Sequence, residues 1–497
     1  MKIGIFFGGS SREREISFAG GRTVYDNLDK SLFEAVPIFV DSLNNLILLD
    51  WQFIYKGTIR DFYPTTDFIP ESKFGFQMYV ESLNSLSDAD LNKMILQIGK
   101  KISFEELPKL IDFGFLCLHG NNGEDGAVQG FLQWLKIPYS GSGILPSAIG
   151  MDKSVQKKLM VAGGFEVPKY AVIKKHDWME CEDYKTLHQR LVKEIGLPMV
   201  IKSANQGSSI GASILHENRL LKFIEAVDKA FFVKIIPIDI WKEKSITEKT
   251  LYIKELTDIR EGLGLPLKIT FNNQSELIFT PDVLMTFIEN HFANGYPILS
   301  MEALDSEKEV VIESFIKGRE FSCIVAQDEN GKPISLPPTE IIKGQDLFDY
   351  RSKYLPGLSR KVTPIQASDE QIQNIRTECE KLFQFFNFNV YARIDGFLSN
   401  DGTIFLNDPN TTSGMLPSSF FFHQAAEIGL NPSQFLTYII ATSIKQRIGL
   451  GFEADKFSAL LNLLNEKITH QKSKITNKIK VAVIMGGYSS ERHISVE

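Results

Sequence analysis

The chain has little cysteine, no long apolar run and no excess of positive charge. Its few cysteines form no CxxC pair and no cluster with histidine, which argues against a zinc site or a disulfide framework. We expect all four in the core: Cys117, Cys181, Cys323 and Cys379. No apolar stretch approaches the ~20 residues of a membrane span, and no signal-peptide pattern opens the chain. A net charge of −7 gives no general attraction to nucleic acid or to an anionic membrane. These absences favour a cytoplasmic protein without nucleic-acid or membrane partners.

The last residues of the chain repeat its first. Residues 480–495 lie over residues 2–17 without a gap, and each copy is an apolar run followed by Gly-Gly and a polar turn that carries Glu-Arg. This pattern predicts a buried strand, a glycine turn and a helix. We therefore expect one complete module followed by the start of a second copy at 480–497, with a strand at Val481–Met485.

A module of this length exceeds the ~250 to 300 residues at which single cores stop growing, so we expect several domains. Apolar runs at 3–7, 35–40 and 113–118 alternate with helix signals over residues 1–150. This is typical of an open, largely parallel α/β sheet, whose ligands bind at the carboxyl ends of the strands. A second unit is expected at 151–315, with a folded insertion at about 234–306, a third at 316–450, and a helix and linker at 451–479.

Two glycine-rich turns follow predicted strands of the first unit. The turn Gly8-Gly-Ser-Ser-Arg-Glu13 is by itself a weak signal, because Gly-Gly turns are common in α/β folds. The loop His119-Gly-Asn-Asn-Gly-Glu-Asp-Gly126 is stronger, since it places a histidine and two carboxylates where a ligand is expected. The alternative is that Glu124 and Asp125 cap the next helix, and for Asp125 we favour it.

The second unit carries two lysines of interest. Lys153 opens a predicted helix, where a lone lysine is usually a solvated charge. Lys202 follows a buried strand and precedes the loop Ser203-Ala-Asn-Gln-Gly-Ser-Ser-Ile-Gly211, which indicates a cation beside amides that can cradle phosphate. The loop lacks the Gly-Lys-Ser/Thr ending of a Walker A motif, so a different nucleotide fold is needed.

Acidic residues recur along the third unit. Glu313 and Glu320 flank a glycine turn and, taken alone, are surface charges. Arg393 and Asp395 share one face of an extended run, and Asp408 and Asn410 share one face of the next. Two carboxylates and an amide oxygen on adjacent strands suit Mg²⁺ bridging nucleotide phosphates. The alternative is a structural ion pair between Arg393 and an aspartate.

Together these segments resemble the D-alanine:D-alanine ligase family of ATP-grasp enzymes, in the right order over nearly the whole module. The resemblance includes Phe348-Asp-Tyr-Arg-Ser-Lys-Tyr354, which looks like the family's mobile loop, and the acceptor end at 410–419. It implies an α/β, ATP-grasp fold: an N-terminal open parallel sheet domain plus two α+β domains that clasp ATP. It also implies that ATP phosphorylates one D-alanine and that a second attacks the acylphosphate, for peptidoglycan precursor synthesis.

The resemblance implies roles for particular residues around the first D-alanine. Glu13 would bind its ammonium group, supported by Ser208 and Tyr354. His119 would lie near its carboxylate. Arg393 and the Gly414 amide would stabilise the tetrahedral oxyanion.

The remaining roles concern the second D-alanine, the nucleotide and the metal. Near the transferred phosphate and the second carboxylate the family pattern places Lys353 and Ser419. ATP would be held by Lys153, Lys202, Ser208, Ser209, Glu313 and Glu320. Two Mg²⁺ or Mn²⁺ ions would be bound by Asp395, Asp408 and Asn410.

The chain departs from the family pattern at two positions. Asp408 stands where the family has Glu, one methylene longer, and Ser413 replaces a proline. Two alternatives stay open: a ligase with another acceptor, such as D-lactate, against which Tyr354 argues, and a nucleotide-binding module without turnover. The insertion is a candidate interaction surface. A homodimer, or packing against a second ligase module, is also possible on this pattern.

Overall fold

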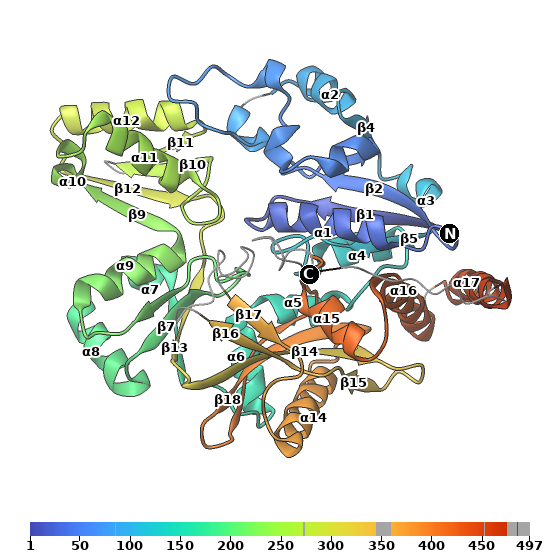
Figure 1. The fold of residues 1–497 in the computed structure, drawn as a ribbon. Helices are drawn as coiled ribbons and strands as arrows, with labels where there is room; N and C mark the ends of the chain where they lie inside the picture. The colour runs from blue at the N-terminus through green and yellow to red at the C-terminus, as the bar shows by residue number, and fades with distance from the viewer. Residues whose placement is uncertain (85, 272–273, 344–358, 452, 475–484, 486–497) are drawn as a thin grey trace.

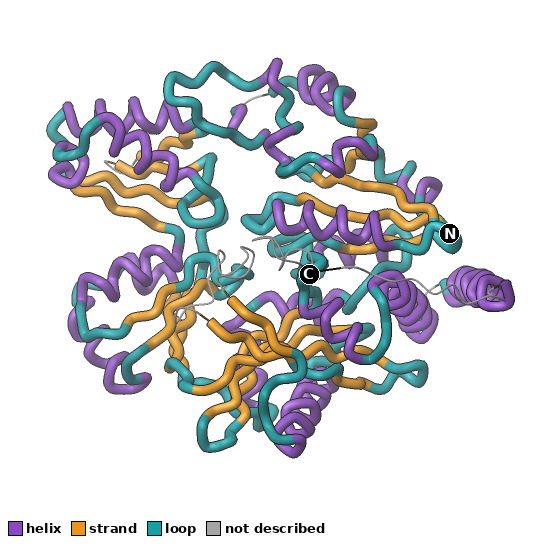
Figure 2. Tube along the Cα trace, in the orientation of Figure 1, coloured by secondary structure: helices purple, strands orange, loops and turns teal. Residues whose placement is uncertain are grey.

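The computed structural model describes residues 1–84, 86–271, 274–343, 359–451, 453–474 and 485. These residues form four sheets with helices packed against them (Figures 1 and 2). Lys353, Tyr354 and the expected strand at 481–485, apart from Met485, lie outside the described residues. None of the helices in the described part of the chain is long and apolar enough to cross a membrane.

The N-terminal sheet has the order β4-β3-β2-β1-β5. Three neighbouring strands are parallel and confirm the predicted strands: β1 (Lys2–Gly8), β2 (Glu34–Val40) and β5 (Phe113–Leu116). Two antiparallel strands on the other side of β2 were not predicted: β3 (Leu46–Leu49) and β4 (Gly99–Lys101). β1 is buried on both faces, as a central parallel strand must be. The first helix, α1 (Arg14–Asn27), starts directly after Glu13.

Short helices cover this sheet and lead out of it. The α-helices are α2 (Asp88–Leu96), α3 (Leu107–Leu110), α4 (Ala127–Trp134) and α5 (Ile144–Met151). The 3-10 turns are η1 (Trp51–Tyr55), η2 (Ile59–Asp61), η3 (Thr66–Phe68) and η4 (Val80–Leu83). The carboxyl ends of β1 and β5 feed the two turns that the sequence singled out, so both turns meet at one edge of the sheet.

A second, antiparallel sheet has the order β6-β13-β7-β8. Its strands are β6 (Tyr170–Lys174), β13 (Glu309–Ser314), β7 (Met199–Ser203) and β8 (Ser213–Leu215). Asp152 caps α6 (Lys153–Ala162) by accepting from the amides of Ser154 and Val155. The other helices of this unit are α7 (Lys175–Met179), α8 (Tyr184–Ile195) and α9 (Leu220–Phe231).

The insertion is folded around a sheet of its own, with the order β11-β10-β12-β9. The strands are β9 (Val233–Pro237), β10 (Leu267–Phe271), β11 (Gln274–Ile278) and β12 (Ile298–Ala303). The helices are α10 (Ile238–Lys242), α11 (Ile246–Thr257) and α12 (Pro281–Ala293). Trp241, Ile253 and Ile288 lie in a separate hydrophobic cluster. The expected extended run at 267–271 and helix at 282–292 are thus confirmed.

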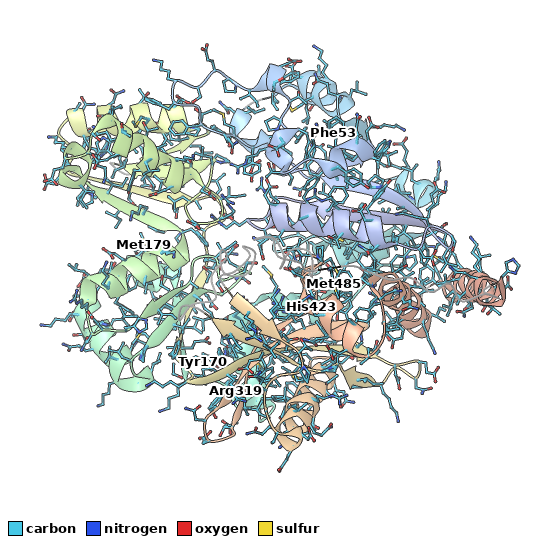
Figure 3. All side chains as sticks on the ribbon, in the orientation of Figure 1. Phe53, Tyr170, Met179, Arg319, His423 and Met485 are labelled. Carbon is cyan, nitrogen blue, oxygen red and sulfur yellow. The ribbon has the colours of Figure 1, made fainter. Side chains whose placement is uncertain are left out.

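The C-terminal sheet is antiparallel, with the order β17-β16-β14-β18-β19 and β15 paired to β14. Its strands are β14 (Gly318–Gln327), β15 (Pro333–Ser335), β16 (Thr339–Lys343), β17 (Ser359–Val362), β18 (Tyr391–Ser399) and β19 (Ile404–Asn410). The helices are α14 (Asp369–Phe385), α15 (Phe420–Glu427), α16 (Pro432–Gly449) and α17 (Ala454–Lys474). Side chains fill the spaces between these elements, as around Arg319 at the start of β14 (Figure 3).

One expectation about the core is wrong. Three of the cysteines are buried, but Cys181 is only half-buried. It follows the short helix α7 in a turn at the edge of the second sheet, where the chain reverses and leaves the side chain near solvent. Its spacing from the other cysteines gave no sign of this, because a lone cysteine carries no periodic pattern.

Candidate active site

Every predicted site residue that the structure describes lines one of two adjoining cavities. The larger, of about 480 Å³, is lined by Lys153, Lys202, Ser209, Glu313, Glu320, Asp395 and Asp408 among others. The smaller, of about 90 Å³, is lined by Glu13, His119, Ser208, Glu320, Arg393, Asp395, Asn410, Gly414 and Ser419 among others. Glu320 and Asp395 belong to both. The two cavities therefore adjoin at these carboxylates.

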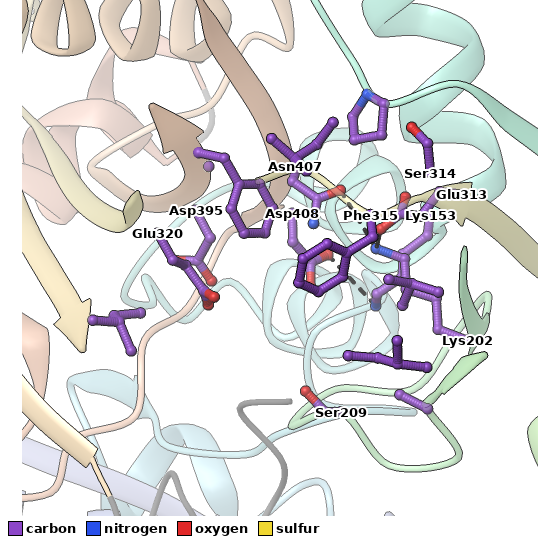
Figure 4. A pocket seen from close by; sticks show the side chains of 18 of the residues that line it. Lys153, Lys202, Ser209, Glu313, Ser314, Phe315, Glu320, Asp395, Asn407 and Asp408 are labelled. Carbon is purple, nitrogen blue, oxygen red and sulfur yellow. Dashed lines mark hydrogen bonds and ion pairs between the residues drawn. The ribbon is translucent and has the colours of Figure 1, made fainter. Parts of the chain in front are cut away.

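A buried charged cluster forms one wall of the larger cavity. Glu313 Oε1 lies 2.7 Å from Lys202 Nζ, and Glu313 Oε2 lies 3.1 Å from Lys157 Nζ. Asn407 Oδ1 accepts from Lys157 at 2.5 Å. Figure 4 shows Glu313, Lys202 and Asn407 of this wall close to one another at the cavity. Glu313 is 3% exposed, so it is not the surface charge that its local sequence favoured.

The environment keeps this cluster charged. Burial acts to raise the pKa of Glu313, but the ammonium groups of Lys157 and Lys202 outweigh it, and the pKa is lowered. For Lys202, burial acts to lower the pKa, and the carboxylates of Glu313 and Asp408 raise it above its usual value. Burial lowers the pKa of Lys157 to about 8 despite Glu313. With Asp408 counted, two lysines face two carboxylates here, so the attraction for an anionic ligand comes from the Lys202 ammonium group itself.

Lys153 is also buried, although a lysine at the start of a helix is usually exposed to solvent. Its Nζ donates to the Gln206 carbonyl at 2.8 Å and lies 3.5 Å from Asp408 Oδ1. The lysine thus joins α6 to the 203–211 loop and to the end of β19. An ammonium group in this position can contact phosphate oxygens while it holds the loop in place.

The predicted metal ligands face one another on β18 and β19. Asp395 pairs in register with Asp408, and Arg393 with Asn410. Arg393 Nε and Nη2 donate to the two Asp395 oxygens at 3.1 and 3.0 Å, so the ion pair that was the alternative interpretation is present. Among the described residues no three His, Cys, Asp or Glu side chains already form a metal-binding group. Hard oxygen donors on facing strands nevertheless fit Mg²⁺, which keeps waters and takes phosphate oxygens as its other ligands.

Glu13 and Ser208 meet in the smaller cavity from opposite sides. Ser208 Oγ donates to Glu13 Oε1, and a Cβ at position 207 would clash with the same carboxylate, which explains the glycine there. Ser208 and Ser209 both have positive φ, at 51° and 58°. Left-handed backbone at two successive non-glycine residues is strained, and such strain is concentrated at ligand sites.

His119 pairs with Glu124, for which the sequence left a capping role open. His119 Nδ1 lies 3.3 Å from Glu124 Oε1, and Thr412 Oγ1 donates to the same carboxylate. Glu124 is therefore not a helix cap. Asp125 accepts from the amide of Ala127 at 3.1 Å, but it precedes the N-cap of α4, which is Gly126, so the expected capping role is wrong for both carboxylates. Burial acts to lower the pKa of His119, but Glu124 and Glu13 outweigh it and raise the pKa above 6.5.

The acceptor end of the cavity is formed by the segment that follows β19. Gly414 lines the cavity and has no heavy atom within 4 Å of where a Cβ would stand. Ser419 is the N-cap of α15, where its side chain accepts from the Phe422 amide. The backbone at Gly414 and the amino end of α15 therefore both face the small cavity.

Sequence reasoning missed two side chains at the larger cavity: Asn407, which lines it, and Lys157, which is buried behind Glu313. It placed Glu124, which lines the smaller cavity, in the predicted ligand loop but gave it no role of its own. For Lys157 a signal existed, because it stands four residues after Lys153 and so on the same face of α6. For Asn407 none existed, since alternation along β19 places it opposite to Asp408. Its contact with Lys157 depends on how α6 packs on the sheet.

Comparison with known proteins divides the chain into an N-terminal and a C-terminal part. A family model described as D-ala D-ala ligase N-terminus matches residues 2–142, and one described as D-ala D-ala ligase C-terminus matches 159–254 and 293–441. The latter leaves out 255–292, which lie in the insertion. A D-alanine--D-alanine ligase of Geobacillus thermodenitrificans is 26% identical over 458 residues, covering 91% of this chain and 99% of the relative.

Solved structures share the fold. The D-alanine-D-alanine ligase from Coxiella burnetii has a TM-score of 0.57 at 18% identity, covering 95% of this chain and 99% of its own. That of Bacillus anthracis complexed with ATP has a TM-score of 0.51 at 23% identity, covering 90% and 98%. The sheets described above are therefore arranged as in structures of this family.

Proposed function

Because the chain belongs to the D-alanine--D-alanine ligase family, we propose that it joins two D-alanine molecules to D-alanyl-D-alanine with ATP as the phosphoryl donor. The product would serve peptidoglycan precursor synthesis, and the use of ATP is consistent with a cytoplasmic location. The observation that carries the proposal is the junction of the two cavities at Glu320 and Asp395. A nucleotide in the larger cavity would point its terminal phosphate at an amino acid in the smaller one.

The first D-alanine would bind in the smaller cavity. The Glu13 carboxylate, oriented by Ser208, would hold its ammonium group, and protonated His119 would face its carboxylate. One carboxylate oxygen then attacks the γ-phosphorus of ATP, the bond to the bridging oxygen breaks, and ADP leaves. Positioning of the two reactants supplies most of the advantage in such a step, because it replaces a bimolecular encounter.

The nucleotide would occupy the larger cavity. Lys153 and Lys202 supply ammonium groups for its phosphates, and Glu313 and Glu320 supply acceptors for the adenine amino group and the ribose hydroxyls. Asp395, Asp408 and Asn410 would hold Mg²⁺ or Mn²⁺, as two ions in the family pattern. The metal would neutralise the phosphate charge that develops during transfer.

In the second step the amine of the other D-alanine attacks the acylphosphate carbonyl. The C–N bond forms, negative charge collects on the carbonyl oxygen, and inorganic phosphate leaves as the carbonyl re-forms and the nitrogen gives up a proton to the departing phosphate. Arg393 and the Gly414 amide line the cavity where this oxyanion would lie. Ser419, at the start of α15, would receive the carboxylate of the second D-alanine.

The direct test is product analysis. We expect ADP release to require D-alanine and a divalent cation, and mass spectrometry to find D-alanyl-D-alanine in equal amount to ADP. L-alanine serves as the matched control and should give neither product. ADP release without dipeptide would favour the non-catalytic nucleotide-binding alternative, and a product only with D-lactate or D-serine added would assign a different acceptor.

The charge on His119 predicts a pH dependence. Because the pKa of His119 is raised above 6.5, the imidazolium that faces the D-alanine carboxylate is lost as the pH rises through the raised value. We expect the KM for the first D-alanine to rise over that range, and His119→Gln to raise KM about 10- to 100-fold while removing the dependence, since hydrogen bonds to charged groups contribute about 1.5–3 kcal/mol.

The same shift affects stability. A raised histidine pKa contributes stability that is complete below 6.5 and is lost as the pH rises through the folded-state pKa.

The control for the KM prediction is His176→Gln, which changes an exposed histidine beside Glu180 far from the cavity. If wild type and His119→Gln share one pH profile for KM, His119 does not bind the carboxylate.

A further inference from the structure

Arg12, next to Glu13 in the first glycine turn, reaches out of the N-terminal sheet unit into the insertion. It is 3% exposed. Its Nε and Nη2 donate to the two Asp305 oxygens at 2.9 and 2.6 Å. The guanidinium carbon lies 3.8 Å from the centre of the Phe232 ring. A surface arginine would make at most some of these hydrogen bonds and ring contacts.

The insertion completes the coordination of this guanidinium with backbone carbonyls. Nη1 donates to the carbonyls of Ile259 and Gly262 at 2.8 and 3.0 Å, and Nη2 donates to that of Leu263 at 2.9 Å. All five guanidinium hydrogens thus have acceptors, which is the full donor capacity of an arginine. Residues 259–263 lie within the stretch that the C-terminal family model leaves out.

The segment that receives Arg12 also holds the loop on the other side of the substrate cavity. Two residues after Asp305, the Glu307 carboxylate accepts from the Asn205 amide at 3.1 Å and from Gln206 Nε2 at 2.9 Å. Gln206 precedes Gly207 and Ser208, which contact Glu13. Residues 305–307 therefore hold both partners of the Glu13–Ser208 hydrogen bond, one through Arg12 and the other through Glu307.

We propose that Arg12 is a positioning residue through which the insertion fixes Glu13 against Ser208 and so sets the affinity for the first D-alanine. The inference rests on the proposed function for the identity of the ligand. Arg12 is not placed to touch the substrate, since its guanidinium is fully engaged by the insertion. Its effect should therefore reach the reaction only through the geometry of Glu13.

The test is the kinetics of Arg12→Met. We expect the KM for the first D-alanine to rise about 10-fold or more, as a loss of 1.4 kcal/mol in binding would give, with the KM for ATP changed less than about twofold. Arg12→Lys keeps the charge but not the planar fork, so its KM should fall between wild type and Arg12→Met. Asp305→Asn should raise the KM for the first D-alanine less than Arg12→Met does.

The matched control is Lys249→Met, which breaks an ion pair with Glu289 inside the insertion without touching Arg12. It should leave both KM values unchanged. If Arg12→Met leaves the D-alanine KM unchanged, or raises both KM values equally, the proposal is wrong. If Arg12→Met does not fold, Asp305→Asn decides by the same two constants.

A readout that needs no activity separates this inference from the proposed function. Hydrogen–deuterium exchange should be faster at residues 9–17 and 205–209 in Arg12→Met than in wild type and in Lys249→Met. If Arg12→Met exchanges faster but the wild-type protein forms no dipeptide, the proposed function is wrong and the positioning role of Arg12 stands. If the wild-type protein forms the dipeptide but exchange in Arg12→Met is unchanged, the positioning role is wrong and the function stands.

Discussion

Replacement of Arg393 by methionine is expected to lower kcat by about 10²- to 10³-fold, the usual cost of removing one donor from an oxyanion site. Arg393 lines the smaller cavity from β18, as Gly414 and Glu13 do from other segments. Methionine keeps much of the length of the side chain but can donate no hydrogen bond. The rate should fall because charge develops on the carbonyl oxygen only in the transition state, and so KM values should change little.

The fold should survive this change. Asp395 loses the guanidinium but keeps the hydroxyl of Ser322, whose Oγ donates to Asp395 Oδ1 at 2.7 Å. Both partners of the Arg393–Asp395 ion pair are about one-fifth exposed, so solvent can partly replace the lost contact. The melting temperature should fall by less than about 4 °C, the upper shift that 1 kcal/mol gives in a domain of roughly 150–250 residues.

Steady-state and single-turnover kinetics check this prediction, with Arg376→Met as the matched control. Arg376 lies on α14 and donates to the Ser335 carbonyl, away from both cavities. Near-normal kcat in Arg393→Met would remove this residue from the oxyanion site and leave the ion pair with Asp395 as its whole role. A loss of kcat with a large loss of melting temperature would point to structure instead of chemistry.

Removal of the Asp408 carboxylate is expected to lower turnover at least about 10²-fold, since a misplaced reactant alone can cost that much. Asp408 stands in register with Asp395 across β18 and β19 and lies 3.5 Å from Lys153. Asp408→Ala would therefore remove a metal ligand and the carboxylate beside a phosphate-binding lysine together. Mg²⁺ demands near-ideal geometry, so the remaining donors could not move to replace it.

Asp408→Glu keeps the carboxylate beside Lys153 and changes only the position that it offers to the metal. If the shorter aspartate leaves a metal position slack, the added methylene should lower the Mg²⁺ concentration that gives half-maximal rate, or raise kcat. Titration of activity with Mg²⁺ in wild type and both variants is the measurement. Asp401→Ala, in the turn between β18 and β19, is the control for loss of an aspartate from the same hairpin. Unchanged activity in Asp408→Ala would exclude Asp408 from the metal site.

The sequence by itself determined the elements and the chemistry that each carries. Apolar runs predicted β1, β2 and β5, and alternation placed Asp395 with Arg393 and Asp408 with Asn410 on common strand faces. These features are local: burial and pleat act on residues within one element, so their periods are visible in the chain. The antiparallel strands β3 and β4 were missed because they are short and β4 is mostly exposed.

Only the tertiary structure decided which distant residues meet. Glu124 turns to His119 because Thr412, 288 positions away in the chain, approaches it from the acceptor segment. Glu313 is buried between two lysines of different elements, although its own neighbours suggested a surface charge. Arg12 donates to Asp305, which is 293 positions away in the chain. Such contacts depend on how whole units pack, and packing is set by the summed burial of many side chains, which no local pattern records.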